Sequence, residues 1–162
     1  MRRWLLLLVV GCSASESKPP PADTPLKIDP RPAPAFTLLD TEGRELSVED
    51  LRGKIVILNF WAAWCAACDG DLQILGRVQE RHPEIQVVGI SYQSGARDQV
   101  SEFGRRLKVQ FPLLIGTRDV IDRYGVATYP TTFILDRDGR MRFCVFNSRT
   151  EEFWDELLRQ VP

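Results

Sequence analysis

The stretch IVILNFWAAWCAACDGD, Ile55 to Asp71, decides the fold, because two structural patterns meet in it. It opens as a nearly unbroken apolar run, which predicts a strand buried on both faces and therefore central in a sheet. Apolar residues then recur at a helical spacing, which predicts a helix over 71–81. A cysteine pair, Cys65 and Cys68, stands at the junction and begins this helix.

Strands and helices alternate through the rest of the chain. The expected strands are 36–40, 45–48, 54–61, 85–92, 111–116, 131–136 and 141–147, and the expected helices are 48–51, 71–81, 96–107, 119–125 and 151–161. Asp138-Gly139 predicts a tight hairpin between the last two strands, and a capping box from Ser148 to Glu151 is expected to start the last helix. This order predicts an α/β sandwich, in which the early strands pair in parallel and the hairpin adds antiparallel strands.

The first twelve residues, MRRWLLLLVVGC, have the layout of a secretory signal. Two arginines precede an apolar run that is far shorter than the ~20 residues needed to span a bilayer. The ending VVGC resembles the bacterial lipobox, which implies a signal peptide over 1–11, cleavage before Cys12 and a lipid on the Cys12 sulfur. Ser13 agrees with sorting to the outer membrane. The alternative is a generic signal or a misplaced start codon, with Cys12 incidental.

Proline dominates the next segment. Seven of the eleven prolines lie between Ser13 and Pro34, so this segment is expected to run extended as a tether. The expected organisation is a lipidated cysteine and tether over 12–34, followed by one globular domain over 35–162. The composition, 44% hydrophobic and 27% charged with a net charge of −1, is that of a soluble globular protein. No basic block follows the first three residues, which disfavours a nucleic-acid partner.

The placement of Cys65 and Cys68 favours redox chemistry. Residues three apart at the start of a helix lie on one face, close enough for the ~5.5 Å Cα separation of a disulfide. At the helix N-terminus, free N–H groups and the helix dipole lower the pKa of Cys65 and favour its thiolate. Cys68, one turn further, is expected to be more buried. Cys65 would then attack a target disulfide, and Cys68 would resolve the mixed disulfide.

Other uses of the cysteine pair fit the sequence less well. A zinc site needs four ligands, and besides the pair the chain offers His82 and a distant Cys144. Copper(I) on two thiolates would lack a nearby histidine. A static staple would close too small a loop to stabilise much. No metal or other cofactor is therefore expected. Cys144 is expected to be a buried apolar side chain, with a second redox partner as the alternative.

Several motifs carry a resemblance to a known family. They are 36–50, LRGK at 51–54, NFWAAWC at 59–65 and YGVATYPTTFILDRDGR at 124–140. These motifs resemble those of the TlpA/ResA-like branch of the thioredoxin-fold proteins. The resemblance covers nearly all of residues 35–162. The resemblance implies a thioredoxin-like fold, with a central mixed sheet flanked by helices and an N-terminal β-hairpin extension. It also implies a bacterial, membrane-tethered thiol–disulfide oxidoreductase that faces an oxidising compartment.

The resemblance also implies roles for residues around the cysteine pair. The two cysteines keep the roles of nucleophile and resolving thiol, and Trp64 shields them. Pro130 corresponds to the family's cis proline, which faces the pair. Thr128 and Tyr129 before it would contact substrate, and Tyr129 would offer backbone hydrogen bonds to an incoming strand. The alternative for Pro130 is a trans proline that begins a strand.

The chain departs from the family near Cys68. Ala67 stands where a proline is usual, Asp71 where the family has glutamate, and Gln73 where it has a second proline. Asn59 replaces the buried acid of thioredoxins proper and cannot take a proton. Asp71 is therefore the candidate proton acceptor for Cys68, with water as the other candidate. The alternative is that Asp71 is a solvated acid favoured by the helix dipole.

The expected function is the reduction of protein disulfides in the cell envelope, for example in cytochrome c maturation or the upkeep of metal-site thiols. Ala66 and Ala67 place no cation beside Cys65, which favours a reductase over an oxidase. The expected partners are a protein disulfide, a membrane reductase as electron donor and the membrane itself, and the protein is expected to be a monomer. A thiol peroxidase is one alternative, although WAAW at 61–64 replaces the proline and threonine that bind peroxide. A non-catalytic tethered binding module is the other.

Overall fold

A computed structural model of the chain describes residues 24–162. Cys12 and the predicted signal peptide lie outside these residues. The strands are β1 (Leu26–Pro32), β2 (Thr37–Leu39), β3 (Glu45–Ser47), β4 (Ile55–Trp61), β5 (Ile85–Ser91), β6 (Leu113–Ile115), β7 (Thr131–Leu135) and β8 (Arg140–Phe146). The helices are the 3-10 turn η1 (Glu49–Leu51), α1 (Ala66–Arg81), α2 (Arg97–Leu107), α3 (Arg118–Tyr124) and α4 (Glu151–Leu158). Within 24–162, no helix has the length and apolar content needed to cross a bilayer.

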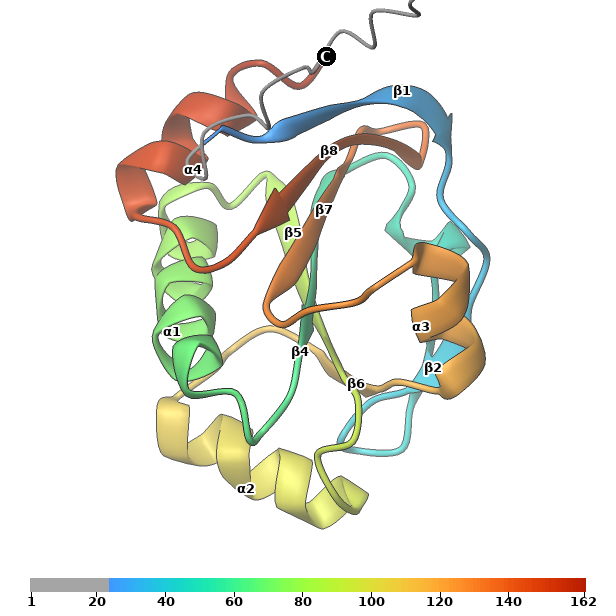
Figure 1. Ribbon diagram of the computed structural model, residues 1–162, viewed down its shortest axis with the longest axis vertical. Helices are drawn as coiled ribbons and strands as arrows, with labels where there is room; N and C mark the ends of the chain where they lie inside the picture. The colour runs from blue at the N-terminus through green and yellow to red at the C-terminus, as the bar shows by residue number, and fades with distance from the viewer. Residues whose placement is uncertain (1–23) are drawn as a thin grey trace, which may run out of the picture.

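The strand β4 lies inside the main sheet, as its apolar sequence predicts. The sheet has six strands in the order β1-β8-β7-β4-β5-β6, and β2 and β3 form a separate hairpin (Figure 1). Every residue of β4 is buried. β4 runs parallel to β5 and β5 parallel to β6, whereas β7 pairs antiparallel with both β4 and β8. The predicted combination of early parallel strands with a late antiparallel hairpin is confirmed.

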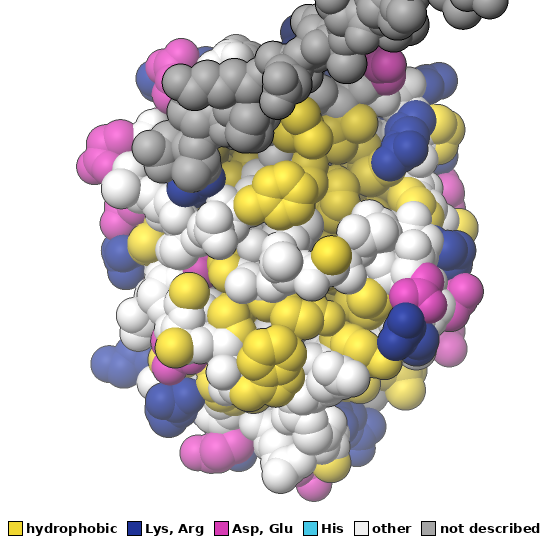
Figure 2. All heavy atoms as spheres, in the orientation of Figure 1, with side chains coloured by type: hydrophobic (Ala, Val, Ile, Leu, Met, Phe, Trp, Pro, Cys, Tyr) yellow, Lys and Arg dark blue, Asp and Glu magenta, His cyan; other side chains and the backbone are white. Residues whose placement is uncertain are grey.

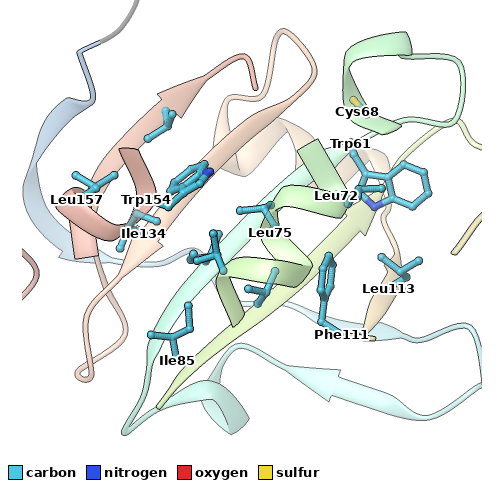
Figure 3. Close-up of a cluster of buried hydrophobic side chains, with 14 of the residues drawn as sticks. Trp61, Cys68, Leu72, Leu75, Ile85, Phe111, Leu113, Ile134, Trp154 and Leu157 are labelled. Carbon is cyan, nitrogen blue, oxygen red and sulfur yellow. The ribbon is translucent and has the colours of Figure 1, made fainter. Parts of the chain in front are cut away.

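Helices cover both faces of this sheet. Buried residues of α1, α2 and α4 belong to one apolar cluster on one face of the sheet. Figure 3 shows Leu75 of α1 and Trp154 of α4 within this cluster. A second cluster lies on the other face and includes Val120 and Tyr124 of α3. Leu38 of the β2–β3 hairpin belongs to the same cluster, so the N-terminal hairpin packs onto the domain as expected.

The first strand corrects the predicted tether. Residues 26–32 are predicted from their proline content to be part of an extended tether, but they form β1 at the edge of the sheet and pair antiparallel with β8. An edge strand tolerates Pro30 and Pro32 because one side of its backbone needs no partner. The register also shifts between Lys27 and Arg31, which accommodates the proline between them. The folded part of the chain therefore begins before residue 35.

The start of α4 also differs from the prediction. The N-cap is Thr150, whose side chain accepts a hydrogen bond from the backbone N–H of Phe153. The predicted capping box from Ser148 to Glu151 is therefore wrong. Ser148 instead lies near the side chain of Asp71 on α1 and lowers the pKa of that carboxyl. The sequence offers two hydroxyl residues as the N-cap, Ser148 and Thr150. Ser148 lies near Asp71, and Thr150 caps the helix.

Gly89 on β5 leads to a prediction about stability. An added Cβ would lie 2.7 Å from Leu113 Cδ2 and 3.1 Å from Trp61 Nε1. We expect Gly89→Ala to lower the free energy of unfolding by about 1–3 kcal/mol, because a packed core cannot take an extra methyl group without strain. Gly76→Ala in α1 is the matched control: its Cβ meets nothing within 4 Å. It is expected to stabilise the protein by about 0.5–1 kcal/mol. Urea denaturation measures both, and a harmless Gly89→Ala would contradict the packing described here.

Candidate active site

The cysteine pair forms a disulfide at the junction of β4 and α1. Cys65 is the N-cap of α1 and Cys68 lies in its first turn, with their Cα atoms 5.4 Å apart. Cys68 is fully buried, whereas 8% of Cys65 is exposed. Cys65 is therefore the cysteine that a partner can reach, as the sequence predicts. Its place at the helix N-terminus stabilises negative charge on its sulfur once the disulfide is reduced.

An aromatic pair lies beside the disulfide. Trp64 is 63% exposed, and its ring meets the ring of Tyr129 edge to face, with centroids 5.6 Å apart. The peptide bond from Tyr129 to Pro130 is cis, as the family resemblance implies. Thr128 belongs to the same turn, where its carbonyl oxygen accepts a hydrogen bond from the Thr131 hydroxyl at 2.8 Å. The three residues predicted to contact substrate, Trp64, Thr128 and Tyr129, are thus brought together.

A groove of about 510 Å³ adjoins this aromatic pair. Trp64, Thr128 and Tyr129 line it together with residues that the sequence interpretation missed, among them Tyr92 and Arg118. Tyr92 follows β5 at the carboxyl end of the parallel strands, the same sheet edge at which Cys65 follows β4. That edge rule could have found Tyr92. Figure 2 shows hydrophobic side chains exposed along the middle of the face that carries β7 and β8 in Figure 1.

Asp71 is buried under the same end of α1. Its side chain has no exposed surface, and its Oδ2 accepts a hydrogen bond from Asn59 Nδ2 at 2.8 Å. The other hydrogen of Asn59 Nδ2 goes to Thr132 Oγ1 at 2.9 Å. Burial raises the pKa of Asp71 from 3.8 to about 6, against the opposing effects of Ser148, Asn59 and Arg149. The alternative of a solvated acid is therefore wrong, and a carboxyl with this pKa can exchange protons near neutral pH.

The segment between β8 and α4, residues 147–150, contacts both parts of the site. The backbone N–H of Asn147 donates to the carbonyl oxygen of Pro130 at 3.1 Å. Ser148 and the backbone of Arg149 lie near Asp71 and lower its pKa, in opposition to the effect of burial. Asn147 adopts a left-handed backbone conformation with φ of 61°, which asparagine tolerates better than most residues. The segment thus links the cis-proline turn to the buried acid.

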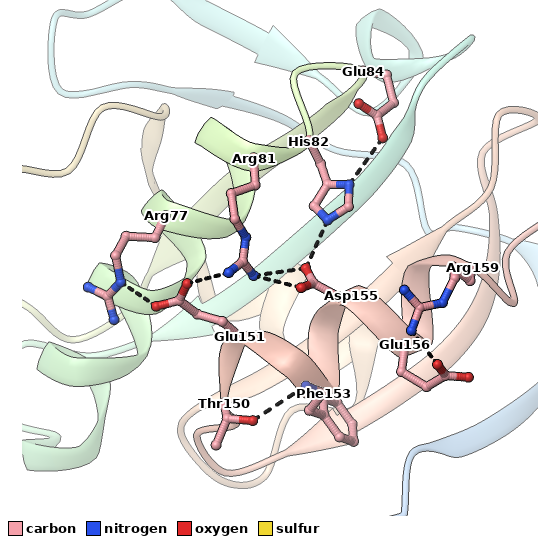
Figure 4. A network of polar contacts seen from close by, with 10 residues as sticks. All are labelled: Arg77, Arg81, His82, Glu84, Thr150, Glu151, Phe153, Asp155, Glu156 and Arg159. Atoms are coloured by element: carbon pink, nitrogen blue, oxygen red, sulfur yellow. Dashed lines mark hydrogen bonds and ion pairs between the residues drawn. The ribbon is translucent and has the colours of Figure 1, made fainter.

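Ion pairs hold α4, and with it this segment, against α1. Glu151 at the start of α4 pairs with Arg77 and Arg81 (Figure 4). Asp155, one turn later, pairs with Arg81 and with His82 at the end of α1, each at 2.8 Å. The hydrogen bond from His82 contributes most to lowering the pKa of Asp155. These pairs are partly exposed, so we assign them a role in alignment rather than a large stabilisation.

Cys144 takes no part in this arrangement. It lies on β8, is 5% exposed and belongs to the apolar cluster on the opposite face of the sheet from Cys65 and Cys68. Burial raises the pKa of its thiol to about 11, so it carries almost no thiolate near neutral pH. The prediction of a buried apolar side chain is confirmed.

Residues 30–144 match the AhpC/TSA family. The chain belongs to this family. The thiol-disulfide oxidoreductase ResA of Geobacillus thermodenitrificans is 35% identical over 134 residues, which cover 80% of this chain and 75% of that protein. The thioredoxin-like protein YneN of Bacillus subtilis is 32% identical over 129 residues, which cover 78% of this chain and 76% of that protein.

A solved structure shares the fold of this chain. A DsbF homologue from Corynebacterium diphtheriae superposes with a TM-score of 0.77 at 22% identity, covering 88% of this chain and 96% of that structure. The predicted thioredoxin-like fold is therefore confirmed. The predicted enzyme class, a thiol–disulfide oxidoreductase with a Cys65–Cys68 pair, is confirmed as well, by the relatives and by the disulfide itself.

Proposed function

We propose that this protein reduces disulfide bonds of protein substrates in the cell envelope, to which it is tethered by a lipid on Cys12. The observation that carries the proposal is the Cys65–Cys68 disulfide at a helix N-terminus, preceded by Trp64, which contacts Tyr129 of the cis-proline turn and lines an open groove. The chemistry needs an exposed nucleophile, a protected second thiol and room for a polypeptide. Cys65, Cys68 and the groove meet these needs in turn.

The reaction begins with the reduced enzyme. The Cys65 thiolate attacks one sulfur of the substrate disulfide, forming a mixed disulfide and releasing the other substrate sulfur as a thiolate. Cys68 then loses its proton to Asp71 and attacks the Cys65 sulfur. The enzyme disulfide forms, and the second substrate sulfur leaves and takes up a proton. Two electrons have passed to the substrate, so a donor must reduce the enzyme again, and a membrane reductase is our candidate.

The site favours the reducing direction. A strongly oxidising pair requires extra stabilisation of the Cys65 thiolate, which lowers the stability of the disulfide relative to the dithiol. The two residues between the cysteines are alanines and add no charge. The chain's single histidine, His82, ends α1 at its far side and pairs with Asp155 there. The helix N-terminus therefore stabilises the Cys65 thiolate without added positive charge from Ala66, Ala67 or His82.

Turnover of two substrates tests the proposal. We expect the protein to catalyse the reduction of insulin disulfides by a dithiol, followed by turbidity, and to turn over hydrogen peroxide only at the rate of an ordinary thiol. Trp61 to Trp64 occupy the positions where a peroxidase needs proline and threonine, which is the reason for the second expectation. Rapid peroxide consumption with slow insulin reduction would replace this proposal by the peroxidase alternative that the family match keeps open.

A further inference from the structure

The two oxygens of the Asp71 carboxyl have different surroundings. Oδ2 accepts a hydrogen bond from Asn59 Nδ2 at 2.8 Å, whereas Oδ1 has no hydrogen-bond partner among the described residues. Both oxygens lie in the protein interior, because Asp71 has no exposed surface. A buried acceptor without a partner is costly and therefore rare, and one reason for a protein to keep it is a role in catalysis.

Asn59 is itself held by the neighbouring strand. Asn59 on β4 and Thr132 on β7 are direct partners in the antiparallel ladder, so their side chains lie on the same face of the sheet. The second hydrogen of Asn59 Nδ2 goes to Thr132 Oγ1 at 2.9 Å. An amide nitrogen carries two hydrogens, and both are used here. The amide therefore cannot turn away from Asp71 without also breaking its bond to Thr132.

We infer that Asn59, fixed by Thr132, is a positioning residue that occupies Oδ2 of Asp71 and leaves Oδ1 to accept the proton of Cys68. The inference rests on the proposed function, in which Cys68 loses its proton to Asp71. These two residues are both buried and lie three apart on α1, which places them on the same face of the helix. Asn59 does not touch the substrate and acts through the carboxyl.

The resolving step balances with the carboxyl held in this way. The S–H bond of Cys68 breaks and an O–H bond forms at Asp71 Oδ1, while Oδ2 keeps the hydrogen bond from Asn59. The electron pair left on the Cys68 sulfur forms the bond to the Cys65 sulfur. The bond between Cys65 and the substrate sulfur breaks, and its electron pair leaves with the substrate thiolate.

The hydrogen bond from Asn59 also favours the form of Asp71 that can accept a proton. It is one of the effects that lower the pKa of this carboxyl against the larger effect of burial. From the segment before α4, Ser148 and both the backbone and the charge of Arg149 act in the same direction. The sheet contributes the neutral Asn59, and α1 contributes Cys68. Loss of the Asn59 amide is therefore expected to release the carboxyl from its position and to disfavour its ionisation.

A variant of similar shape and a double-mutant cycle test the inference. Asn59→Leu has nearly the shape of asparagine but donates no hydrogen bond. Reduced protein is mixed with dithiobis(nitrobenzoate), and the second thionitrobenzoate released reports the attack of Cys68. We expect Asn59→Leu to slow this step about tenfold at pH 7.5, less than the roughly 10²–10⁴ that a general base contributes, and to move its inflection to higher pH. In the Asp71→Asn background the same change is expected to have no further effect on the rate.

Two variants of Thr132 test the inference with Asn59 in place, and they serve also if Asn59→Leu does not fold. Thr132→Val removes the acceptor of the Asn59 amide but keeps the shape, and Thr132→Ser keeps the hydroxyl. The valine variant is expected to move the inflection to higher pH, and the serine variant to leave it near that of wild type. Ser91→Ala is the control, because it removes a buried hydroxyl of the same sheet that hydrogen-bonds the Leu114 carbonyl oxygen instead. It is expected to change neither the rate nor the inflection.

The outcomes separate a positioning role from a structural one. Equal slowing by Asn59→Leu with and without the Asp71 carboxyl would overturn the inference, because Asn59 would then support only the fold. Equal inflections in Thr132→Val and Thr132→Ser would overturn it as well. Titration of the Asp71 carboxyl by ¹³C NMR in the oxidised protein is a readout without substrate, and its midpoint is expected to be higher in Asn59→Leu than in wild type. Failure of wild type to reduce insulin would instead remove the proposed function, and the dye assay and this titration would still decide the role of Asn59.

Discussion

Replacing Cys65 with serine is expected to abolish disulfide reduction entirely, whereas replacing Cys68 is expected to halt the reaction half-way. Cys65 is the more exposed of the two cysteines and lies at the helix N-terminus, so without it no mixed disulfide can form. In Cys68→Ser the first attack proceeds, but the buried thiol that would resolve the product is missing. The mixed disulfide should therefore accumulate, and denaturing gels without reductant, followed by mass spectrometry, would identify the trapped protein.

Cys144→Ser is the matched control for these variants. This cysteine lies on the other face of the sheet and is buried, so its loss is expected to leave both insulin reduction and trapping unchanged. Trapping through Cys144 would contradict the assignment of Cys65 as nucleophile. Unchanged biological function in Cys65→Ser would favour the non-catalytic binding module instead.

Much of the fold could be predicted from patterns that are local in the sequence. The apolar run of β4 and the helical spacing after Cys68 were sufficient to place a buried strand and the helix that carries the disulfide. The local patterns failed where a distant contact decides the structure. Residues 26–32 have the composition of a linker, but the free edge of β8 pairs with them. Ser148 has the spacing of a helix cap, but Asp71 lies within its reach.

The sequence predicts individual residues of the site but not the contacts between them. The two cysteines were located from the sequence, and the cis proline was implied by the family resemblance. The burial of Asp71 could not be seen, because its neighbours Asn59 and Ser148 come from strand and loop segments far along the chain. The substitution of asparagine for the acid of thioredoxins reads in sequence as a lost proton acceptor. In the structure Asn59 donates a hydrogen bond to Asp71 on α1, the residue that we propose as the proton acceptor.

Asp71→Asn is expected to make the protein slower and more stable at the same time. Asp71 must be ionised to take the proton of Cys68, so the resolving step in wild type is expected to rise with pH through about 6 and then level off. The asparagine variant is expected to lose this inflection and to resolve about 100-fold more slowly at pH 7.5. The release of thionitrobenzoate as a function of pH measures both effects.

The stability effect follows from the same burial. The pKa of Asp71 is raised on folding, from 3.8 to about 6, so the stability that its neutral form provides is present below pH 3.8 and is lost as the pH rises through 6. The cost at pH 8 is on the order of 3 kcal/mol, since each pKa unit corresponds to about 1.4 kcal/mol. Asparagine has nearly the same shape, and its carbonyl oxygen can still accept the hydrogen bond of Asn59. Oxidised Asp71→Asn is therefore expected to be more stable than wild type at pH 8 and about equally stable at pH 3.5.

Asp69→Asn is the control for both measurements. It removes an acid from the same turns of α1, but one that is partly exposed and pairs with Arg106 at 3.5 Å rather than lying in the core. It is expected to leave the inflection of the resolving step near pH 6 and to change stability little at either pH. If Asp71→Asn proved no more stable than wild type at pH 8, the conclusion that burial disfavours the ionised form of Asp71 would be wrong. A retained inflection would show that another group, or water, accepts the proton of Cys68.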